Sequence, residues 1–237
     1  AEDQQMLITF AQIHDIDMWL QPAGLDSAHP LHPADSHLCY RLPEFDIEMP
    51  FKPTDFTQVN HQVNRVLVSK AIQLLAPQSS DRVLDLFCGI GNFTLPLARR
   101  ATEVFGIEGS DELTKRAKEN AIHNHLGDRI NFACSNLFEV TPEVIKSWGK
   151  ADKWLIDPPR DGAMALVTAL GMMANSDDTE VKTYLPKRIV YVSCNPATFA
   201  VDAAILCDNN YQLVELTPID QFYWNSHIEI VALFVCL

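Results

Sequence analysis

The hydrophobic positions of this chain change their pattern near residue 55. From there on, short apolar runs alternate with longer stretches whose apolar residues recur at helical spacing. The short runs predict buried strands, and the longer stretches predict helices. The expected strands are residues 82–86, 103–107, 130–133, 153–156, 188–192, 211–216 and 228–235, and the expected helices are residues 63–75, 92–100, 111–124, 162–173 and 197–208.

The order of these elements predicts the architecture. Alternating strands and helices indicate a mostly parallel, doubly wound sheet, because parallel strands need a crossover between them. No helix separates the last two expected strands, so we expect them to be antiparallel. The expected fold is therefore α/β, with a seven-stranded, mostly parallel sheet, an antiparallel last strand and a short N-terminal β segment. This arrangement resembles the Rossmann-like sheet of class I methyltransferases. Asp111 is expected to cap the helix that it begins.

The N-terminal part follows a different pattern. Residues 6–10 and 18–20 are short apolar runs that we expect to be strands, and residues 41–49 are expected to continue a small sheet. Prolines and a glycine interrupt the chain between and after these runs. We therefore expect residues 1–50 to be the remnant of a central β-rich domain, and residues 51–237 to form the main domain.

Composition and charge restrict the class of protein. With 237 residues, of which 47% are hydrophobic, the chain can bury the core of one α/β domain. The formal net charge of −13 disfavours nucleic acid as a partner, because phosphate contacts need Lys and Arg. The chain has no apolar run of membrane-spanning length and no signal-peptide pattern at its start. We therefore expect a cytoplasmic protein with no membrane partner.

The cysteines and histidines predict no metal site. The six cysteines form no CxxC pair, so their spacing indicates neither a zinc site nor a disulfide framework. Three histidines, His29, His32 and His37, lie close together without partners at metal-ligand spacing, which favours a solvent-exposed loop. In a reducing compartment most of the cysteines would be small buried hydrophobic residues. One of them remains a candidate nucleophile.

A glycine-containing loop, residues 85–93, joins the first strand of the main domain to its helix. Gly89 and Gly91 let the backbone approach a ligand, but Thr94 follows where a dinucleotide fold needs a third glycine. This disfavours a nicotinamide oxidoreductase. Glu108 ends the second strand, where a carboxylate can accept hydrogen bonds from ribose hydroxyls; a helix-capping surface acid is the alternative. Asp85 of the loop motif and Glu108 at the end of the second strand suit S-adenosylmethionine, whose sulfonium is cationic and which has no pyrophosphate.

Four motifs occur in a fixed order: FTQVN at residues 56–60, DLFCGIGNFTLPLA at 85–98, SCNPAT at 193–198 and HIE at 227–229. Over roughly residues 50–237 the chain resembles the bacterial RNA uridine-C5 methyltransferases. The resemblance implies an enzyme that transfers a methyl group from S-adenosylmethionine to C5 of a uridine in RNA, with no role for DNA. It favours the ribosomal branch, which acts on 23S rRNA, and leaves a tRNA enzyme as an alternative.

The resemblance also assigns residues. Cys194 matches the nucleophile and Glu229 the general base. The cofactor pocket is matched by Gln58, Phe87, Asn92, Glu108, Asn136 and Asp157. Full members carry an N-terminal OB-like RNA-binding domain, and the ribosomal branch an iron–sulfur cluster. Because this chain has neither, we expect it to be part of a longer protein; a cluster, if present, would be bound by the absent part, which would also hold much of the basic surface.

A cysteine as nucleophile and a glutamate as base suit the implied chemistry. C5 of uracil is a poor nucleophile, and a thiolate that adds to C6 makes C5 enolate-like. A base must then remove the C5 proton before the thiol leaves. For Cys194 to be a thiolate at neutral pH, we expect nearby helix amides to lower its pKa. A partly buried Glu229 with a raised pKa would hold a proton at the right moment.

Two features depart from the family or leave its roles open. The family reads Phe-Pro-His-Thr before its last motif, whereas this chain has FYWN at residues 222–225. Phe222, Tyr223 and Trp224 would either stack on an extruded base or belong to the core. Arg160 ends the Asp-Pro-Pro-Arg loop, where it would meet an RNA phosphate or pair with an acid.

Rival activities are separated by single residues. An RNA cytosine-C5 methyltransferase usually has a second cysteine in a Pro-Cys pair where this chain has Pro158 and Pro159, which disfavours it. A nitrogen methyltransferase would leave Cys194 without a role. A non-catalytic adenosylmethionine-binding RNA chaperone or assembly factor predicts that Cys194→Ala leaves function intact.

Overall fold

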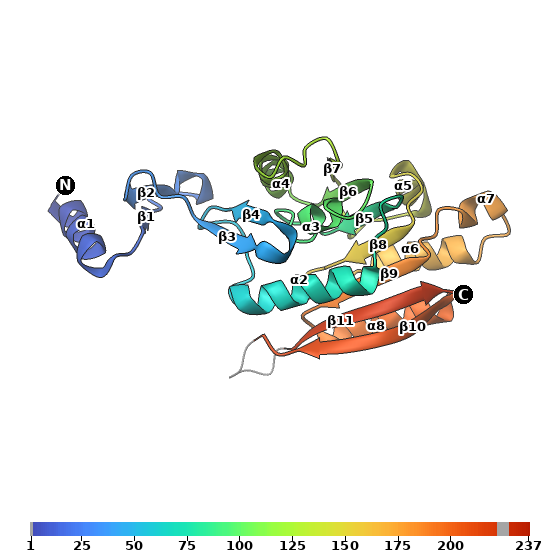
Figure 1. The fold of residues 1–237 in the computed structure, drawn as a ribbon. Coiled ribbons are helices and arrows are strands. Elements are labelled where there is room, and N and C mark those ends of the chain that lie inside the picture. Colours follow the sequence, from blue (N-terminus) through green and yellow to red (C-terminus); the bar gives the residue numbers. More distant parts are fainter. Residues whose placement is uncertain (1, 222–227) are drawn as a thin grey trace.

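A seven-stranded sheet forms the centre of the computed structural model, which describes residues 2–221 and 228–237 (Figure 1). The strand order is β10-β11-β9-β8-β5-β6-β7. All pairs among β5 to β9 are parallel, and β11 runs antiparallel between β9 and β10, so the predicted sheet is confirmed. The strands are β5 (Arg82–Leu86), β6 (Glu103–Glu108), β7 (Ile130–Cys134), β8 (Lys153–Ile156), β9 (Arg188–Ser193), β10 (Tyr211–Ile219) and β11 (Glu229–Cys236).

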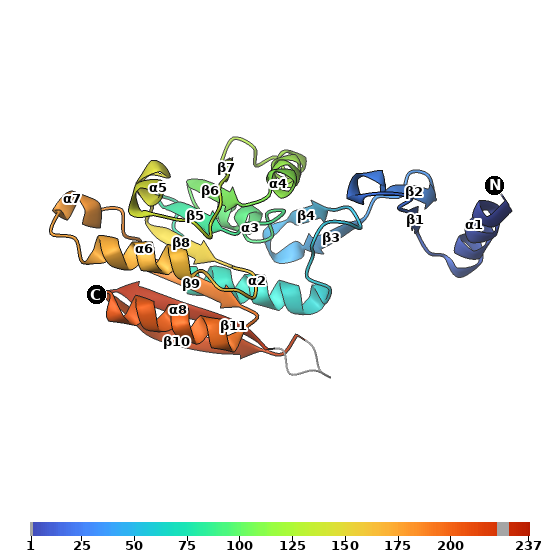
Figure 2. The ribbon, with the colours of Figure 1, turned by 180° about the vertical axis from the view of Figure 1, so that it is seen from behind.

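Strand residues alternate between two hydrophobic layers, one on each face of the sheet. In β9, Val190 and Val192 join one layer, whereas Ile189 and Tyr191 join the other. Figure 1 shows α2 across the first face, and Figure 2 shows α6 and α8 on the second. The first layer contains residues of α2 (His61–Leu75), α3 (Thr94–Ala98) and α4 (Asp111–His123), and the second contains residues of α5 (Pro142–Ser147), α6 (Met164–Ala174), α7 (Thr179–Lys182) and α8 (Pro196–Asp208).

Polar side chains cap the N-termini of α2 and α4. Asn60 caps α2 by accepting a hydrogen bond from the Val63 amide at 3.2 Å. The predicted cap at Asp111 is wrong, because Ser110 accepts from the amide of Leu113 and Asp111 is the first helical residue of α4. There Asp111 still favours the helix through its charge near the N-terminus.

The N-terminal segment corrects two sequence expectations. Residues 6–10 lie within α1 (Glu2–His14) rather than in a strand, since no glycine or proline interrupts the run. The region predicted as a loop contains β2 (His29–His32), which pairs antiparallel with the predicted strand β1 (Met18–Leu20). A 3-10 turn, η1 (Leu25–Ser27), joins the two strands. Both views show α1, β1 and β2 lying to one side of the main body.

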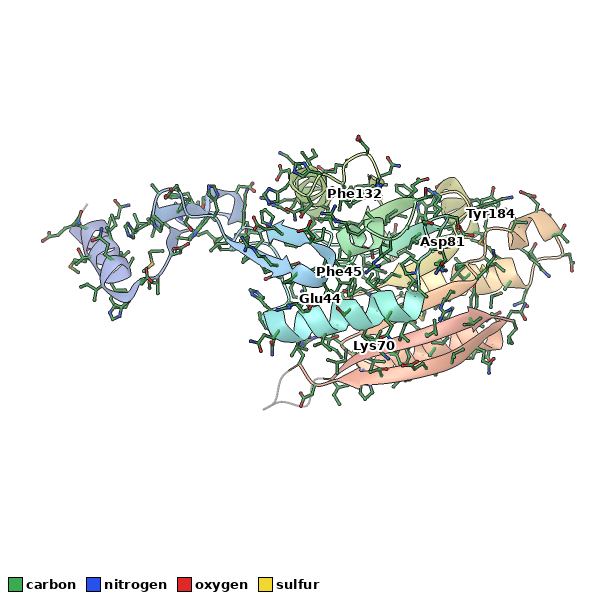
Figure 3. The ribbon with its side chains drawn as sticks, in the orientation of Figure 1. Glu44, Phe45, Lys70, Asp81, Phe132 and Tyr184 are labelled. Atoms are coloured by element: carbon green, nitrogen blue, oxygen red, sulfur yellow. The ribbon has the colours of Figure 1, made fainter. Side chains whose placement is uncertain are left out.

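The predicted β structure over residues 41–49 is present, but it forms a hairpin of its own that packs against the main body, and it does not continue the sheet of β1 and β2. Strand β3 (Cys39–Leu42) pairs antiparallel with β4 (Ile47–Pro50) across the turn η2 (Pro43–Phe45). Its apolar side chains, Met49 among them, belong to the same layer as α2, and Figure 3 places Phe45 between the hairpin and that helix. The predicted domain boundary at residue 50 stays a prediction.

Within residues 2–221 and 228–237, no helix is both long and apolar enough to cross a bilayer. The same described ranges contain no group of three or more His, Cys, Asp or Glu side chains arranged to hold a metal ion. The N-terminal histidines therefore form no such cluster within these ranges.

Candidate active site

The ends of four neighbouring strands bring most of the predicted cofactor residues to one edge of the sheet. Phe87 follows β5, Glu108 ends β6 and Asn136 follows β7, and these three strands lie side by side. Asp157 follows β8, on the other side of β5. Ligands of doubly wound sheets bind at the carboxyl ends of such strands. The structure therefore collects these four side chains where a nucleotide-like ligand would bind.

Glu108 is oriented by the backbone on both sides. The amide of Gly89 donates to Oε2 at 2.9 Å, and the amide of Ser110 donates to Oε1 at 3.1 Å. Gly89 has a φ of 54°, and a Cβ added there would meet no atom within 4 Å. Because Ser110 itself caps α4, Glu108 is not needed as a helix cap. Its carboxylate is thus held beside an open part of the loop.

Phe87 and Asn136 lie in adjoining loops. Phe87 has a φ of 64°, an uncommon value for a residue other than glycine, and its amide donates to the carbonyl of Ile107 at 2.9 Å. Its ring meets Phe138 edge-on, with ring centroids 5.7 Å apart. The Asn136 side chain accepts from the Phe138 amide at 3.0 Å. Aromatic contact and local hydrogen bonding therefore fix the two loops against each other.

The remaining two predicted cofactor residues are engaged with other amides. Asn92 exchanges hydrogen bonds with Asn64 of α2, at 2.9 Å and 3.0 Å, and also accepts from the Tyr40 hydroxyl at 2.9 Å. Gln58 accepts from Nε2 of Gln221 at 2.8 Å. Gln221 is buried and is not among the site residues predicted from the sequence. The one sequence feature that could have indicated it is its position directly before residues 222–227.

The two predicted catalytic residues lie opposite each other. Ile230 pairs with Ser193 in the antiparallel ladder of β11 and β9, so Glu229 is level with Cys194. Cys194 is partly exposed, whereas Glu229 is buried. Asp157 belongs to the same edge, because Ile156 pairs with Tyr191 of β9.

Strand alternation gives Asp85 and Glu229 a common face. A residue two positions along a strand points to the same side of the sheet, and Val83 and Val231 both belong to the hydrophobic layer of α2. Asp157 and Cys194 come directly after β8 and β9, and the charge of Glu229 acts on both of them. Three carboxyl groups and one thiol therefore lie together at one end of the sheet.

Burial and mutual repulsion raise the pKa values of this group. Burial raises the pKa of Asp85 to about 7, and it also raises the pKa of Glu229. The pKa of Asp157 lies well above its usual range because of burial first, and then because of the charges of Glu229 and Asp85. Within the described ranges none of these carboxyl groups forms an ion pair with Lys, Arg or His.

The expected lowering of the pKa of Cys194 by helix amides is wrong for this structure. Burial raises the pKa of the thiol, and the charges of Glu229 and Asp157 raise it further. The opposing charge of Arg160 lowers the pKa of both Cys194 and Glu229. The arrangement is therefore one in which an added cation would favour the thiolate and the carboxylates together.

A hollow of about 420 Å³ adjoins this edge between α5 and α6. Its lining includes Phe138, Asp161, Gly162 and the exposed Met164, but none of the eight predicted site residues. It borders the loop after β8 without forming the site itself. The predicted stacking residues Phe222, Tyr223 and Trp224, together with His227 of the last motif, lie outside the described residues.

Solved structures with this arrangement define the class. Pyrococcus horikoshii TYW2, in complex with MeSAdo, matches 98% of this chain and 83% of its own with a TM-score of 0.60 at 16% identity, which shows likeness of fold alone. The Pyrococcus abyssi tRNA (uracil-54, C5)-methyltransferase, in complex with S-adenosyl-L-homocysteine, has a TM-score of 0.68 at 30% identity, covering 84% of this chain and 44% of its own. The fold is that of the class I methyltransferases.

The family follows from the sequence match. The family model for tRNA (uracil-5-)-methyltransferase matches residues 40–235, and the chain belongs to this family. The 23S rRNA (uracil(1939)-C(5))-methyltransferase RlmD of Polynucleobacter necessarius is 56% identical over 99% of this chain, and that of Ralstonia pickettii is 55% identical over 99%. These matches span 49% and 52% of the two relatives, so the chain has about half of their length.

Proposed function

We propose that the full-length protein transfers a methyl group from S-adenosylmethionine to C5 of a uridine in 23S rRNA, giving 5-methyluridine. The observation that carries the proposal is the placement of Cys194 opposite Glu229 at the ligand edge of a methyltransferase sheet. C5 methylation needs a nucleophile and a base that both reach the same uracil ring. The choice of RNA is supported by the names of the relatives that match nearly the whole chain.

The residues at this edge suit the cofactor. Glu108 holds an oriented carboxylate beside the open space over Gly89. One oxygen of Asp85, Oδ1, is buried and has no hydrogen-bond partner within the described ranges. Together with the unpaired acids nearby, this favours a cationic ligand over an anionic one. The residues that would hold the cofactor are Gln58, Phe87, Asn92, Glu108, Asn136 and Asp157. When bound, S-adenosylmethionine supplies an electrophilic methyl group.

Cys194 begins the reaction as a thiolate. Its electron pair forms a bond to C6 of the uracil, and the π electrons of the C5–C6 double bond move towards C5 and O4. C5 thereby becomes nucleophilic enough to take the methyl group; the bond between that methyl group and the cofactor's sulfur would break, and S-adenosylhomocysteine would leave. The loop geometry supports this role, since the Asn195 amide donates to Oγ of Ser193 at 3.1 Å and closes a tight turn around Cys194.

Glu229 completes the reaction as the base. Its carboxylate takes the proton from C5, the electrons of the C–H bond re-form the double bond, and the bond between C6 and sulfur breaks to return the thiolate. Burial raises the pKa of Glu229, which makes its carboxylate a stronger base than an exposed glutamate. The position across from Cys194 lets both groups reach one ring.

Methyl transfer to purified RNAs tests the proposal. Full-length protein, labelled S-adenosylmethionine and unmodified 23S rRNA or tRNA are combined, and the labelled nucleoside is identified after digestion. We expect labelled 5-methyluridine from 23S rRNA and none with Cys194→Ala. Label in tRNA alone would assign the tRNA substrate instead. Cofactor binding without transfer to either RNA would favour the non-catalytic chaperone.

A further inference from the structure

The first turns of α8 hold the loop that follows β8. Asn195 Nδ2 donates to the carbonyl oxygen of Arg160 at 3.0 Å, and the hydroxyl of Thr198 donates to the same oxygen at 3.0 Å. The Thr198 hydroxyl also lies 3.2 Å from the carbonyl of Asn195, so its single proton is shared between two acceptors. Two side chains at the start of α8 thus hold one carbonyl group of an exposed loop.

A buried carboxylate further along α8 holds the other end of this loop. Asp202 Oδ2 accepts from the Ala163 amide at 2.7 Å and from the hydroxyl of Tyr191. Asp202 is 1% exposed, so these bonds are shielded from water. Gly162 has a φ of 77°, and a Cβ there would lie 2.8 Å from Asp202 Oδ2. The loop is therefore anchored at residue 160 and again at residue 163.

The anchored loop carries a cation that acts on the active site. Within residues 2–221 and 228–237, Arg160 is the only positively charged side chain found to lower the pKa of both Cys194 and Glu229. Arg160 itself is exposed, so packing does not hold its side chain in place. The position of the guanidinium therefore depends on the backbone that carries it. Asn195 directly follows Cys194. The start of α8 directly follows Cys194, and it also holds the backbone from which the Arg160 side chain extends.

We propose that Asn195 and Thr198 are positioning residues, which hold the Arg160 backbone so that its guanidinium lies beside Cys194 and Glu229 during methyl transfer. This inference rests on the function proposed above. Its physical basis is that a cation close to the thiolate and the carboxylate stabilises both charged forms against their mutual repulsion. Arg160 would then act on the site's own acids, and an RNA phosphate would not be its main partner.

Thr198→Val tests this role, because it removes the hydroxyl and keeps the branched shape. Thr198→Ser is the matched control, since it keeps the hydroxyl. Arg160→Met removes the charge, and the double variant tests whether Thr198 acts through Arg160. In the full-length protein, the alkylation rate of Cys194 by iodoacetamide is followed against pH on the Cys194 peptide by mass spectrometry. Methyl transfer gives kcat and KM in parallel.

We expect Thr198→Val to raise the pKa of the Cys194 thiol and to lower kcat by about tenfold, with KM for the cofactor unchanged. Thr198→Ser should restore both values. The double variant should be no worse than Arg160→Met alone. Unchanged alkylation and kcat in Thr198→Val, or fully additive effects in the double variant, would overturn the proposal.

Two further controls separate the possible failures. Should Thr198→Val fold poorly by thermal melting, Thr198→Ala measures the same loss of the hydroxyl. The alkylation readout needs neither RNA nor cofactor, so it decides the positioning role even if the wild type transfers no methyl group. Absence of transfer by the wild type contradicts the proposed function, whereas an unchanged thiol pKa in the variants contradicts the positioning role.

Discussion

Glu229 lies level with Cys194, because Ile230 pairs with Ser193 across β11 and β9. The antiparallel direction of β11 produces this relationship. The parallel strands end at the ligand edge, so residues that follow them collect there, but β11 begins at that edge and brings its first residue instead. A parallel last strand would have carried Glu229 to the opposite end of the sheet. The strand reversal therefore supplies the site with its base.

Replacing the nucleophile should separate binding from chemistry. We expect Cys194→Ala to lower methyl transfer by on the order of 10⁴-fold or more, because no other group can form the bond to C6. The cofactor affinity, measured by isothermal titration calorimetry, should stay within about threefold of wild type, since the thiol is small and lies outside the predicted cofactor pocket. Retained methylation by this variant contradicts the mechanism.

Replacing the base should trap the intermediate. In Glu229→Gln the thiolate can still add to C6 and the methyl group can still be transferred, but the C5 proton has no acceptor. We expect a covalent protein–RNA complex that survives denaturing electrophoresis and requires Cys194. Glu112→Gln, an exposed glutamate of α4, is the matched control and should give no such band. Free turnover by Glu229→Gln would show that another group removes the proton.

The same substitution should change the ionisation of the thiol. The charge of Glu229 raises the pKa of Cys194, second only to burial, so its removal in Glu229→Gln should lower that pKa. More thiolate is then present at a given pH, and the alkylation profile of the Cys194 peptide should move to lower pH. Glu112→Gln should leave the profile unchanged. A profile that moves to higher pH, or not at all, contradicts the arrangement of charges described for the site.

The buried carboxyl of Asp85 should make stability depend on pH. Burial raises the pKa of Asp85 from 3.8 to about 7; the Thr94 hydrogen bond acts against this shift and the charge of Glu108 adds to it. A folded-state pKa above the unfolded value contributes stability that is complete below pH 4 and is lost as the pH rises to about 7. At about 1.4 kcal/mol per pH unit, the loss corresponds to about 4 kcal/mol.

Comparison with Asp85→Asn isolates this contribution. The asparagine does not ionise, so the variant should gain stability over wild type as the pH rises from 4 to 7, and the difference should then level off. Urea unfolding at several pH values measures the free energy of unfolding directly. A difference that is constant with pH would show that Asp85 does not carry this titration.

Much of the main domain could be predicted because its strands are short, mostly apolar and followed by loops with clear motifs. Asp157 and Cys194 were placed at the ligand edge simply because each follows a predicted strand. The short helices α5 and α7 were missed, since four to six residues are too few to show helical periodicity. The run at residues 6–10 was misread because α1 buries only Ala11 and so has no clear apolar face.

Side-chain relationships between distant segments could not be predicted. Nothing in the spacing of Thr198 and Arg160 shows that a hydroxyl of one meets the carbonyl of the other. The bond between Gln221 and Gln58 joins segments that only the folded sheet brings together. The direction of the Cys194 pKa was predicted wrongly because helix amides were considered alone, whereas burial and two neighbouring acids determine the balance.

The central claim is that the methyl group replaces the hydrogen at C5 of uracil through an adduct with Cys194. The most direct test gives the full-length protein unmodified 23S rRNA with tritium at C5 of its uridines, and S-adenosylmethionine labelled with carbon-14 in the methyl group. We expect one tritium released to water for each methyl group transferred, and neither event with Cys194→Ala. Methyl transfer without release of tritium would place the methyl group on another atom and contradict the account.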